Sequence, residues 1–421
     1  MDRILIRGGK PLSGTVAISG AKNAALPIMA ASLLTSEPLQ LDNVADLADI
    51  ASMQRLLQHV GVSATYVAGE PTRMVLHAPD ILTATAPYDL VRKMRASVLV
   101  LGPLLARTGR ARVSLPGGCA IGPRPIDLHL MGLERLGARI ELVDGYVEAT
   151  APKGLVGGEI RLPQPSVGAT ENLMLAATLA RGETLIAGAA REPEVVDLAA
   201  CLNAMGARIE GAGASQVRIV GVPALHGASH RIIADRIEAG TYAMAAAITG
   251  GRLLLEDVPL ELFGAAKEVL EAAGLVLEPT AEGLLVMLGE GGLQGTDAIT
   301  RPFPGFATDL QAQFMALMCV SHGAAMITET IFENRFMHVP ELARLGARIN
   351  VHGASALVRG VPELKGAPVM ATDLRASVSL VLAALAAKGQ TEINRIYHLD
   401  RGYERLEQKL AAVGAEIERV P

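Results

Sequence analysis

The chain has 421 residues, of which 50% are hydrophobic and 19% are charged, so it can build large apolar cores and is not intrinsically disordered. Its 38 basic and 43 acidic residues give a net charge of −5, which argues against a general nucleic-acid or anionic-membrane surface. The three cysteines fit a reducing cytoplasm better than a disulfide framework. The start, MDRILIRGGK, is unlike a secretory signal, and no apolar run is long enough to span a bilayer.

Two kinds of helix alternate along the chain. Helices of the first kind are rich in Ala, Leu and Met with few charges, which predicts that they are buried almost all round. In chain order they are expected at residues 21–34, 93–106, 168–180, 238–250, 307–319 and 372–386. Two of the cysteines, Cys201 and Cys319, lie in apolar helical patterns and are expected to be buried.

Helices of the second kind end in a glycine that is followed by a strand, as in LERLGARI and LARLGARI. A left-handed glycine cap explains this pattern. The capping glycines recur roughly every 70 residues and are Gly61, Gly137, Gly206, Gly274, Gly346 and Gly414. Short strands such as TLIAGA and TEINRI separate the two kinds of helix. The pattern predicts an α/β protein of six repeated units, grouped as three plus three into two similar domains. A single solenoid or a single sheet is the alternative.

One inter-helix segment, SLPGGCAIGPRPIDLH, is about four residues longer than its equivalents in the other units, which is a hint of function. It presents Cys119 on a Gly-Gly turn near Arg124, and a nearby guanidinium favours the reactive thiolate. The spacing is C-x4-R, one residue short of the cysteine-phosphatase loop. The sequence contains no P-loop, no H-E-x-x-H and no C-x-x-C motif.

Six basic residues stand at corresponding places in the repeats. Lys22, Arg95 and Arg375 lie at the starts of helices of the first kind, where anions bind readily. Arg124, Arg335 and Arg401 lie ahead of, or in the first turn of, helices of the second kind. Each alone fits a surface charge, but together they favour an anion site lining a cleft between the domains.

Two acidic residues, Asp309 and Asp373, follow a threonine at the start of buried helices. The Thr-Asp pair is typical of a helix N-cap, and we expect that role first. A carboxylate among arginines would also remain ionised and accept a hydroxyl proton where the geometry permits.

The chain resembles the UDP-N-acetylglucosamine 1-carboxyvinyltransferases, a family of enolpyruvyl transferases. The resemblance rests on SGAKNAALP, KMRAS, LPGGCAIGPRPIDLH, SVGATEN, TDLQAQFMA, FENRFMHVPEL, DLRAS and LDRGYERLEQKL, which run from residue 19 to residue 410. The related shikimate-pathway transferase lacks the cysteine loop and the FENRFMH segment. A non-catalytic repeat protein that binds anions is the remaining alternative.

The resemblance implies an inside-out α/β barrel fold with its active site in the interdomain cleft. Family topology assigns residues 1–21 and 234–421 to one domain and residues 22–233 to the other, each with three α/β units. The implied reaction transfers the enolpyruvyl group of phosphoenolpyruvate to the sugar 3′-hydroxyl and releases phosphate, as the first committed step of peptidoglycan synthesis. No cofactor, metal, nucleic acid or membrane is implied.

The resemblance also implies roles for individual residues. Cys119 would donate a proton and form a covalent adduct, Asp309 would take the hydroxyl proton, and Lys22 and Asp373 would complete the catalytic set. The phosphoenolpyruvate contacts would be Lys22, Asn23, Arg124, Arg335, Arg375 and Arg401.

The nucleotide-sugar contacts would be Asn23, Arg95, Arg124, Pro125, Ile126, Asp127, Leu128, Gln164, Pro165, Ser166, Val167, Asp309 and Ile331. Some members of the family carry lysine where this chain has Gln164, so the diphosphate contacts there would depend more on backbone amides.

Overall fold

The computed structural model describes residues 2–116 and 125–421. These residues form two compact units. The C-terminal unit consists of residues 2–19 and 234–421, and the N-terminal unit consists of residues 20–116 and 125–233. Each unit has its own apolar core, so the chain contains two separately buried hydrophobic clusters.

In the described part of the N-terminal unit, twelve strands form three sheets of four. The first sheet, in spatial order, consists of β14 (Ala228–Arg231), β3 (Leu39–Asp42), β5 (Glu70–His77) and β4 (Ser63–Val67). The second consists of β6 (Thr85–Ala86), β7 (Arg110–Ser114), β9 (Tyr146–Thr150) and β8 (Arg139–Val143). The third consists of β10 (Glu159–Arg161), β11 (Glu183–Ala187), β13 (Gln216–Val220) and β12 (Arg208–Glu210).

The described C-terminal unit likewise has three sheets of four strands. Their bounds are β2 (Ser13–Ala17), β15 (Arg252–Glu256), β17 (Gly283–Leu288) and β16 (Leu275–Thr280); β18 (Ala298–Ile299), β19 (Ala324–Thr328), β21 (Ser355–Arg359) and β20 (Arg348–His352); β22 (Pro368–Met370), β23 (Gln390–Asn394), β1 (Arg3–Arg7) and β24 (Glu416–Val420).

All six sheets have the same topology. The first strand pairs parallel with the second, and the remaining pairs are antiparallel, as in β10–β11 followed by β13 and β12. The predicted six-fold α/β repeat is therefore confirmed. In the last sheet, β1 from the N-terminus takes the place that a hairpin strand takes in the others, pairing with β23 and β24.

Two edge strands are exchanged between the units. Strand β2 precedes α1 in the chain but pairs parallel with β15, and β14 precedes α8 but pairs parallel with β3. Within the residues that the structure describes, the chain therefore passes directly from one unit to the other after residue 19 and after residue 233. Beside these crossings, Asp235 donates its backbone N–H to Ser19 O at 2.9 Å, and Ala21 donates to Ile233 O at 2.7 Å.

The helices of the N-terminal unit are α1 (Lys22–Ala31), η1 (Ser32–Leu34), α2 (Ala48–Val60), α3 (Tyr88–Val91), η2 (Arg95–Val100), α4 (Leu101–Thr108), α5 (Asp127–Arg135), α6 (Val167–Ala177) and α7 (Pro193–Ala204). Those of the C-terminal unit are α8 (Arg236–Ile248), η3 (Leu260–Phe263), α9 (Ala266–Ala272), η4 (Thr308–Leu310), α10 (Gln311–Met318), α11 (Val339–Arg344), α12 (Ala376–Ala386), η5 (Ile396–Arg401) and α13 (Leu406–Ala412).

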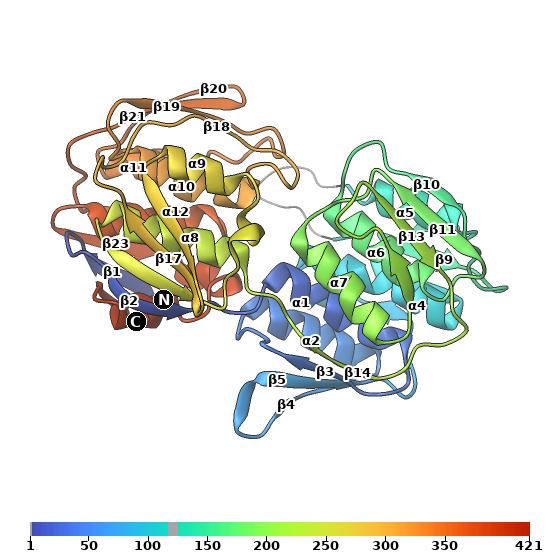
Figure 1. The fold of residues 1–421 in the computed structure, drawn as a ribbon. Helices are drawn as coiled ribbons and strands as arrows, with labels where there is room; N and C mark the ends of the chain where they lie inside the picture. The colour runs from blue at the N-terminus through green and yellow to red at the C-terminus, as the bar shows by residue number, and fades with distance from the viewer. Residues whose placement is uncertain (1, 117–124) are drawn as a thin grey trace. The chain divides into compact units, whose positions relative to one another are not determined.

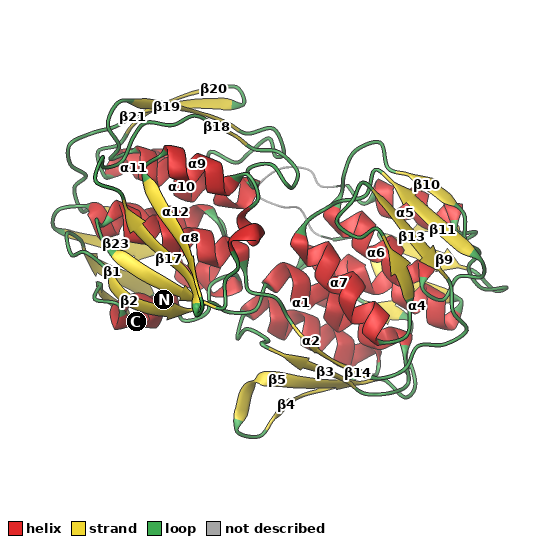
Figure 2. Cartoon of the chain, in the orientation of Figure 1, coloured by secondary structure: helices red, strands yellow, loops and turns green. Residues whose placement is uncertain are grey.

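Helices of the first kind occupy the middle of each unit, as predicted from their composition. In the C-terminal unit α8, α10 and α12 contact one another, and nearly all their residues are buried. The strands lie outside them with alternating buried and exposed residues, so helices are inside and sheets outside (Figures 1 and 2). The six capping glycines all have positive φ, for example 114° at Gly61 and 103° at Gly414.

The helix predicted at residues 93–106 begins differently in the structure. Residues 95–100 form the 3₁₀ helix η2, and the α-helix begins only at Leu101. Pro103 explains the difference, because its ring would clash with the carbonyl of Leu99 in a continuous α-helix. In the first turn of α4, where it lies, proline is tolerated.

Candidate functional site

The C-terminal unit brings two arginines onto one carboxylate. Arg335 Nη2 donates to Asp309 Oδ1 at 2.7 Å, and Arg375 Nε lies 3.4 Å from Asp309 Oδ2. Asp309 lies in η4, Arg335 in the loop after β19, and Arg375 immediately before α12. The side chains of Arg335 and Arg375 are only 7% and 3% exposed. Three of the predicted site residues therefore form one buried cluster.

This cluster keeps hydrogen-bond donors open. Arg375 Nη1 and Nη2 and Arg335 Nε are buried and have no partner among the described residues. Buried polar atoms without partners are uncommon in folded proteins. The two Nη atoms of Arg375 form a planar fork of the kind that grips a carboxylate bidentately. The arrangement can therefore accept an anion without displacing Asp309 from Arg375 Nε.

The charge of Arg375 is secure despite its burial. Burial lowers the pKa of the guanidinium, but the oxygens of Tyr403, Asp309 and Asp235 outweigh that effect and the net pKa is raised. Its Cζ lies 5.5 Å from the centre of the Tyr403 ring, within range of a cation–π contact. Similarly, Arg335 Cζ lies 5.2 Å from the centre of the Phe332 ring. Both cations are thus held against aromatic faces.

The N-cap prediction is confirmed for Asp373. Asp373 Oδ1 accepts from the backbone N–H groups of Arg375 at 2.8 Å and Ala376 at 3.0 Å, which fixes the start of α12. For Asp309 the N-cap role stays a prediction. The Asp309 carboxylate pairs with the guanidinium groups of Arg335 and Arg375, and such charge-assisted bonds are stronger than a cap to a neutral N–H.

Other buried polar atoms near the cluster also lack a partner among the described residues. They belong to Gln313, which bonds the Asp309 carbonyl, to His338, which interacts electrostatically with Asp373 and Arg335, and to Thr372 and Asp373, which come just before Arg375 in the chain. Burial lowers the pKa of His338 to about 4 and outweighs the effect of Asp373, which raises that pKa. The His338 ring is therefore neutral at pH 7. Neither of its ring nitrogens has a partner within the described residues. Several buried polar groups near the arginines therefore have hydrogen-bonding capacity that the described residues do not use.

Glu329 was not found by sequence reasoning. It is 3% exposed and follows β19. Its Oε1 accepts from the backbone N–H groups of Ile331 at 2.8 Å and Phe332 at 3.1 Å, and its Oε2 accepts from Thr308 Oγ1 at 2.8 Å. Glu329 therefore fixes the loop that carries the predicted contact Ile331 and the residue that precedes Asp309. A glutamate at the end of a strand gives no sequence signal for such a role.

In the N-terminal unit, Lys22 is the first residue of α1 and is buried against an acid. Its Nζ lies 3.2 Å from Asp49 Oδ2, and the two side chains are 8% and 5% exposed. Asp49 lies in the first turn of α2. Sequence reasoning missed Asp49 because an acid there also fits a simple helix-dipole role. Asn23, the next residue of α1, is partly exposed.

Arg95 is the first residue of η2 and binds the backbone of the segment that leads into α5. Its Nη2 donates to the carbonyl of Pro125 at 2.9 Å. Ile126 is buried, Asp127 is the exposed first residue of α5, and Leu128 is partly exposed. Cys119 and Arg124 lie outside the described residues, so the structure says nothing of their place.

The predicted segment 164–167 leads into α6. Gln164 and Pro165 are exposed, and Ser166 and Val167 are partly exposed. Ser166 Oγ accepts from Ala169 N at 3.4 Å and caps α6. One predicted contact in the C-terminal unit, Arg401, ends η5 and is partly exposed.

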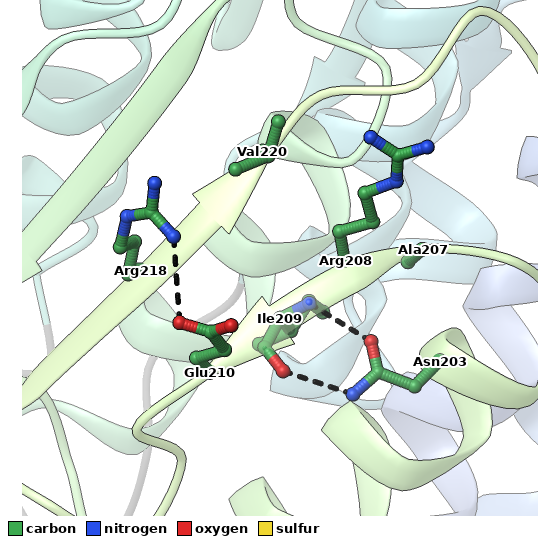
Figure 3. Close-up of a pocket in the computed structure, with 7 residues that line it drawn as sticks. All are labelled: Asn203, Ala207, Arg208, Ile209, Glu210, Arg218 and Val220. Carbon is green, nitrogen blue, oxygen red and sulfur yellow. Dashed lines mark hydrogen bonds and ion pairs between the residues drawn. The ribbon is translucent and has the colours of Figure 1, made fainter.

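A surface pocket on the N-terminal unit lies apart from these residues (Figure 3). Asn203 holds both the N–H and the carbonyl of Ile209, at 2.9 and 3.0 Å, and Arg218 pairs with Glu210 at 3.4 Å. Asn203, Ile209, Glu210 and Arg218 are thus bonded among themselves, and none of the predicted site residues lines this pocket. In residues 2–116 and 125–421 no group of three His, Cys, Asp or Glu side chains is placed to hold a metal ion. No helix in the same residues is long and apolar enough to cross a membrane.

Comparison with solved structures defines the class of this fold as that of the enolpyruvyl transferases. The enolpyruvyl transferase NikO from Streptomyces tendae matches with a TM-score of 0.88 and 28% identity, over 100% of this chain and 99% of NikO. EPSP synthase from Acinetobacter baumannii matches with a TM-score of 0.78 over 100% of both chains, and at 18% identity it shows the fold alone. The family model for EPSP synthase (3-phosphoshikimate 1-carboxyvinyltransferase) matches residues 6–410.

Sequence relatives narrow this class. UDP-N-acetylglucosamine 1-carboxyvinyltransferases from Rhodospirillum centenum and Acidiphilium cryptum are each 64% identical to this chain, covering 100% of it and 99% and 100% of the relatives. The same enzyme from Caulobacter vibrioides is 59% identical over 100% of this chain. The chain therefore belongs to the UDP-N-acetylglucosamine 1-carboxyvinyltransferase family, within the wider EPSP synthase family.

Proposed function

We propose that this enolpyruvyl transferase moves the enolpyruvyl group of phosphoenolpyruvate to the 3′-hydroxyl of UDP-N-acetylglucosamine and releases inorganic phosphate. Full-length relatives at 59–64% identity carry that name. The observation on this chain that supports it most is the buried Arg335–Asp309–Arg375 cluster with its open guanidinium nitrogens. A small dianionic substrate with a carboxylate fits such a site.

The reaction consists of an addition followed by an elimination. In the addition, the sugar oxygen forms a bond to C2 of phosphoenolpyruvate, the hydroxyl loses its proton and C3 gains one. In the elimination, C3 loses a proton, the C2–O bond to phosphate breaks and the double bond re-forms. The enzyme must therefore supply a proton acceptor, a proton donor and cations for both anionic groups.

Each requirement is assigned to particular residues. We assign the carboxylate to Arg335 and Arg375, because both pair with Asp309 and both keep nitrogens without a partner among the described residues. Asp309 accepts the hydroxyl proton and orients the sugar, and its side chain is 24% exposed and so within reach of a ligand. Asp373 supports Arg375 by capping the helix that follows it.

The phosphate is held by Lys22, Arg124 and Arg401, with Asn23 beside Lys22. Asp49 acts in this site by orienting the Lys22 ammonium at 3.2 Å. Cys119 donates the proton to C3 and forms a covalent adduct with phosphoenolpyruvate. The thiol of Cys119 should also open the epoxide fosfomycin, and peptide mass spectrometry after fosfomycin treatment would test this assignment. An unmodified Cys119 peptide would contradict it.

The nucleotide-sugar contacts are assigned to the same residues as the family resemblance implies. In the C-terminal unit the contacts are Asp309 and Ile331, and Glu329 fixes the backbone of Ile331. The N-terminal unit supplies Asn23, Arg95, Arg124, residues 125–128 and residues 164–167. Arg95 acts partly by holding the Pro125 carbonyl. Because Gln164 is exposed and uncharged, we assign the diphosphate contacts in its segment to backbone N–H groups.

A phosphate-release assay with two acceptors tests the proposal. Purified protein is incubated with phosphoenolpyruvate and either UDP-N-acetylglucosamine or shikimate 3-phosphate. Phosphate release only with the nucleotide sugar supports the proposal. Release only with shikimate 3-phosphate would select the other branch of the family, and ligand binding without release would select a non-catalytic binding protein. We place the reaction in the cytoplasm, where its product enters peptidoglycan synthesis.

A further inference from the structure

A buried polar network lies beneath the arginine cluster and involves residues with no assigned role. It joins Thr241 of α8, Gln313 of α10 and Tyr403, which follows η5. The Thr241 Oγ1 and Tyr403 OH atoms are 3.0 Å apart, and Gln313 Nε2 lies 3.2 Å from Thr241 Oγ1 and 3.1 Å from Tyr403 OH. All three residues are at most 2% exposed, so water does not compete for these bonds.

The hydrogen bonds of this network have one consistent direction. Thr241 Oγ1 donates its only hydrogen to the carbonyl of Ile237 at 2.7 Å, so it accepts from the Tyr403 hydroxyl. The Tyr403 oxygen in turn accepts from Gln313 Nε2. The second hydrogen of Gln313 Nε2 goes to the backbone carbonyl of Asp309 at 2.8 Å. Every hydrogen in this chain of bonds therefore has an acceptor, which fixes the three side chains.

The network ends on two residues of the proposed site. Through Gln313 it fixes the backbone of Asp309, and through Tyr403 it presents an aromatic ring to Arg375, whose Cζ lies 5.5 Å from the ring centre. Burial raises the pKa of Tyr403, so the phenol stays protonated and keeps donating to Thr241. The ring and the carbonyl are thus held by one set of bonds.

We propose that Tyr403 is a positioning residue for the proposed reaction. Its hydroxyl, held between Thr241 and Gln313, sets the plane of the ring, and the ring sets the plane of the Arg375 guanidinium. The open Nη fork then faces the carboxylate of phosphoenolpyruvate in a fixed orientation, while Asp309 is fixed by the same glutamine. This inference rests on the proposed function, because it names how that site is oriented.

The matched pair of variants is Tyr403→Phe and Tyr242→Phe. Tyr403→Phe removes the hydroxyl but keeps the ring. Tyr242 is the neighbour of Thr241 in α8, is fully buried, and its hydroxyl has no partner in the described parts of the chain. Both changes delete a buried phenolic oxygen, but only one deletes a bond of the network. Purely structural effects of losing a hydroxyl are therefore controlled.

The readout is steady-state kinetics for both substrates, with phosphoenolpyruvate binding measured by calorimetry. For Tyr403→Phe we expect KM and Kd for phosphoenolpyruvate to rise about tenfold, the size of effect for one lost positioning bond to a charged site. KM for UDP-N-acetylglucosamine should change less than twofold. Tyr242→Phe should leave all values within twofold. Thr241→Val should reproduce the Tyr403→Phe defect, whereas Thr241→Ser, which keeps a hydroxyl, should have the constants of the unmodified protein. In the double variant Thr241→Val/Tyr403→Phe the two effects on KM and Kd should be non-additive.

The inference is overturned if Tyr403→Phe behaves like Tyr242→Phe, or if it shifts KM for both substrates equally. Should Tyr403→Phe fold poorly, the Thr241→Val and Thr241→Ser comparison decides between the same outcomes. Failure of the proposed function is distinguishable, because it appears in the unmodified protein as no phosphate release with either acceptor. In that event the calorimetric Kd for phosphoenolpyruvate still compares the variants, and equal Kd values or no binding would reject the positioning role.

Discussion

Asp309→Asn is the change that tests the candidate site most directly. The carboxylate has one oxygen on Arg335 at 2.7 Å and the other on Arg375 at 3.4 Å. Asparagine has the same shape but only one acceptor oxygen. Whichever way the amide turns, its NH2 group faces a guanidinium donor. The substitution thus removes the negative charge, breaks at least one hydrogen bond and removes the proposed proton acceptor.

The stability cost follows from these contacts. A hydrogen bond to a charged group contributes about 1.5–3 kcal/mol, and the two arginines are nearly fully buried, so we expect a loss of about 3 kcal/mol. At roughly 2–4 °C per kcal/mol for a unit of this size, the melting temperature should fall by about 6–12 °C. Turnover should fall by about 10²–10⁴, the usual contribution of a positioned general base.

Differential scanning calorimetry, phosphate release and nucleotide-sugar binding measure these effects together. Phosphoenolpyruvate should raise the melting temperature of Asp309→Asn more than that of the unmodified protein, because an anion replaces the lost charge between the arginines. UDP-N-acetylglucosamine should still bind. Asp42→Asn is the control, since its ion pair with Arg73 is partly exposed and should contribute little to stability. Unchanged turnover in Asp309→Asn would refute the role of proton acceptor.

Three further predictions concern other buried groups. Burial lowers the pKa of His338 to about 4 and that of His129 to about 3, below the unfolded value near 6.5. The contribution of these neutral rings to the free energy of unfolding is therefore fully present above about pH 6.5. It should fall by up to about 1.4 kcal/mol per pH unit per histidine as the pH drops towards 4. Urea titrations from pH 7 to 4 should show a shallower slope for His338→Gln. Lys22→Met should lower the free energy of unfolding by about 3–5 kcal/mol, because the buried Asp49 carboxylate loses its Lys22 counterion. Adding Asp49→Asn should restore the urea midpoint but not the activity. Glu329→Gln should raise KM for UDP-N-acetylglucosamine several-fold and leave KM for phosphoenolpyruvate nearly unchanged, and equal changes in the two constants would contradict its role in fixing Ile331.

The repeat made the fold predictable, because composition and the capping glycines recur in every unit. Alanine-rich segments without charges can be stable only in the middle of a unit, and the structure places α8, α10 and α12 there. The 3₁₀ start at residues 95–100 could not be located from composition, since it depends on how Pro103 meets the carbonyl four residues earlier. The pairing of β2 with β15 and of β14 with β3 could not be derived from the repeat, because strand pairing depends on partners distant in the chain. Only the family resemblance assigned residues 1–21 to the C-terminal domain.

The candidate site was only partly predictable. Basic residues at helix starts stand out because they oppose the helix dipole, so Lys22 and Arg375 were found. For Asp309 the N-cap pattern is the stronger signal in the sequence, because one sequence cannot show that two arginines from other segments meet its carboxylate. The acids Asp49 and Glu329 were missed for the same reason: their partners are a lysine and two backbone amides that only the fold brings near.

The repeat also explains why chemistry gathers at the starts of the first-kind helices. Within the C-terminal unit α8, α10 and α12 contact one another, so residues at equivalent positions near their N-termini are brought together. Asp309, ahead of α10, and Arg375, ahead of α12, occupy such positions and approach to 3.4 Å. Thr241, in the second turn of α8, and Gln313, in the first turn of α10, are hydrogen-bonded to each other next to this contact. A repeat buries three similar helices side by side. When each helix carries a polar residue near its start, these residues meet and form one polar cluster. Tyr403 completes this cluster by contacting Thr241, Gln313 and Arg375.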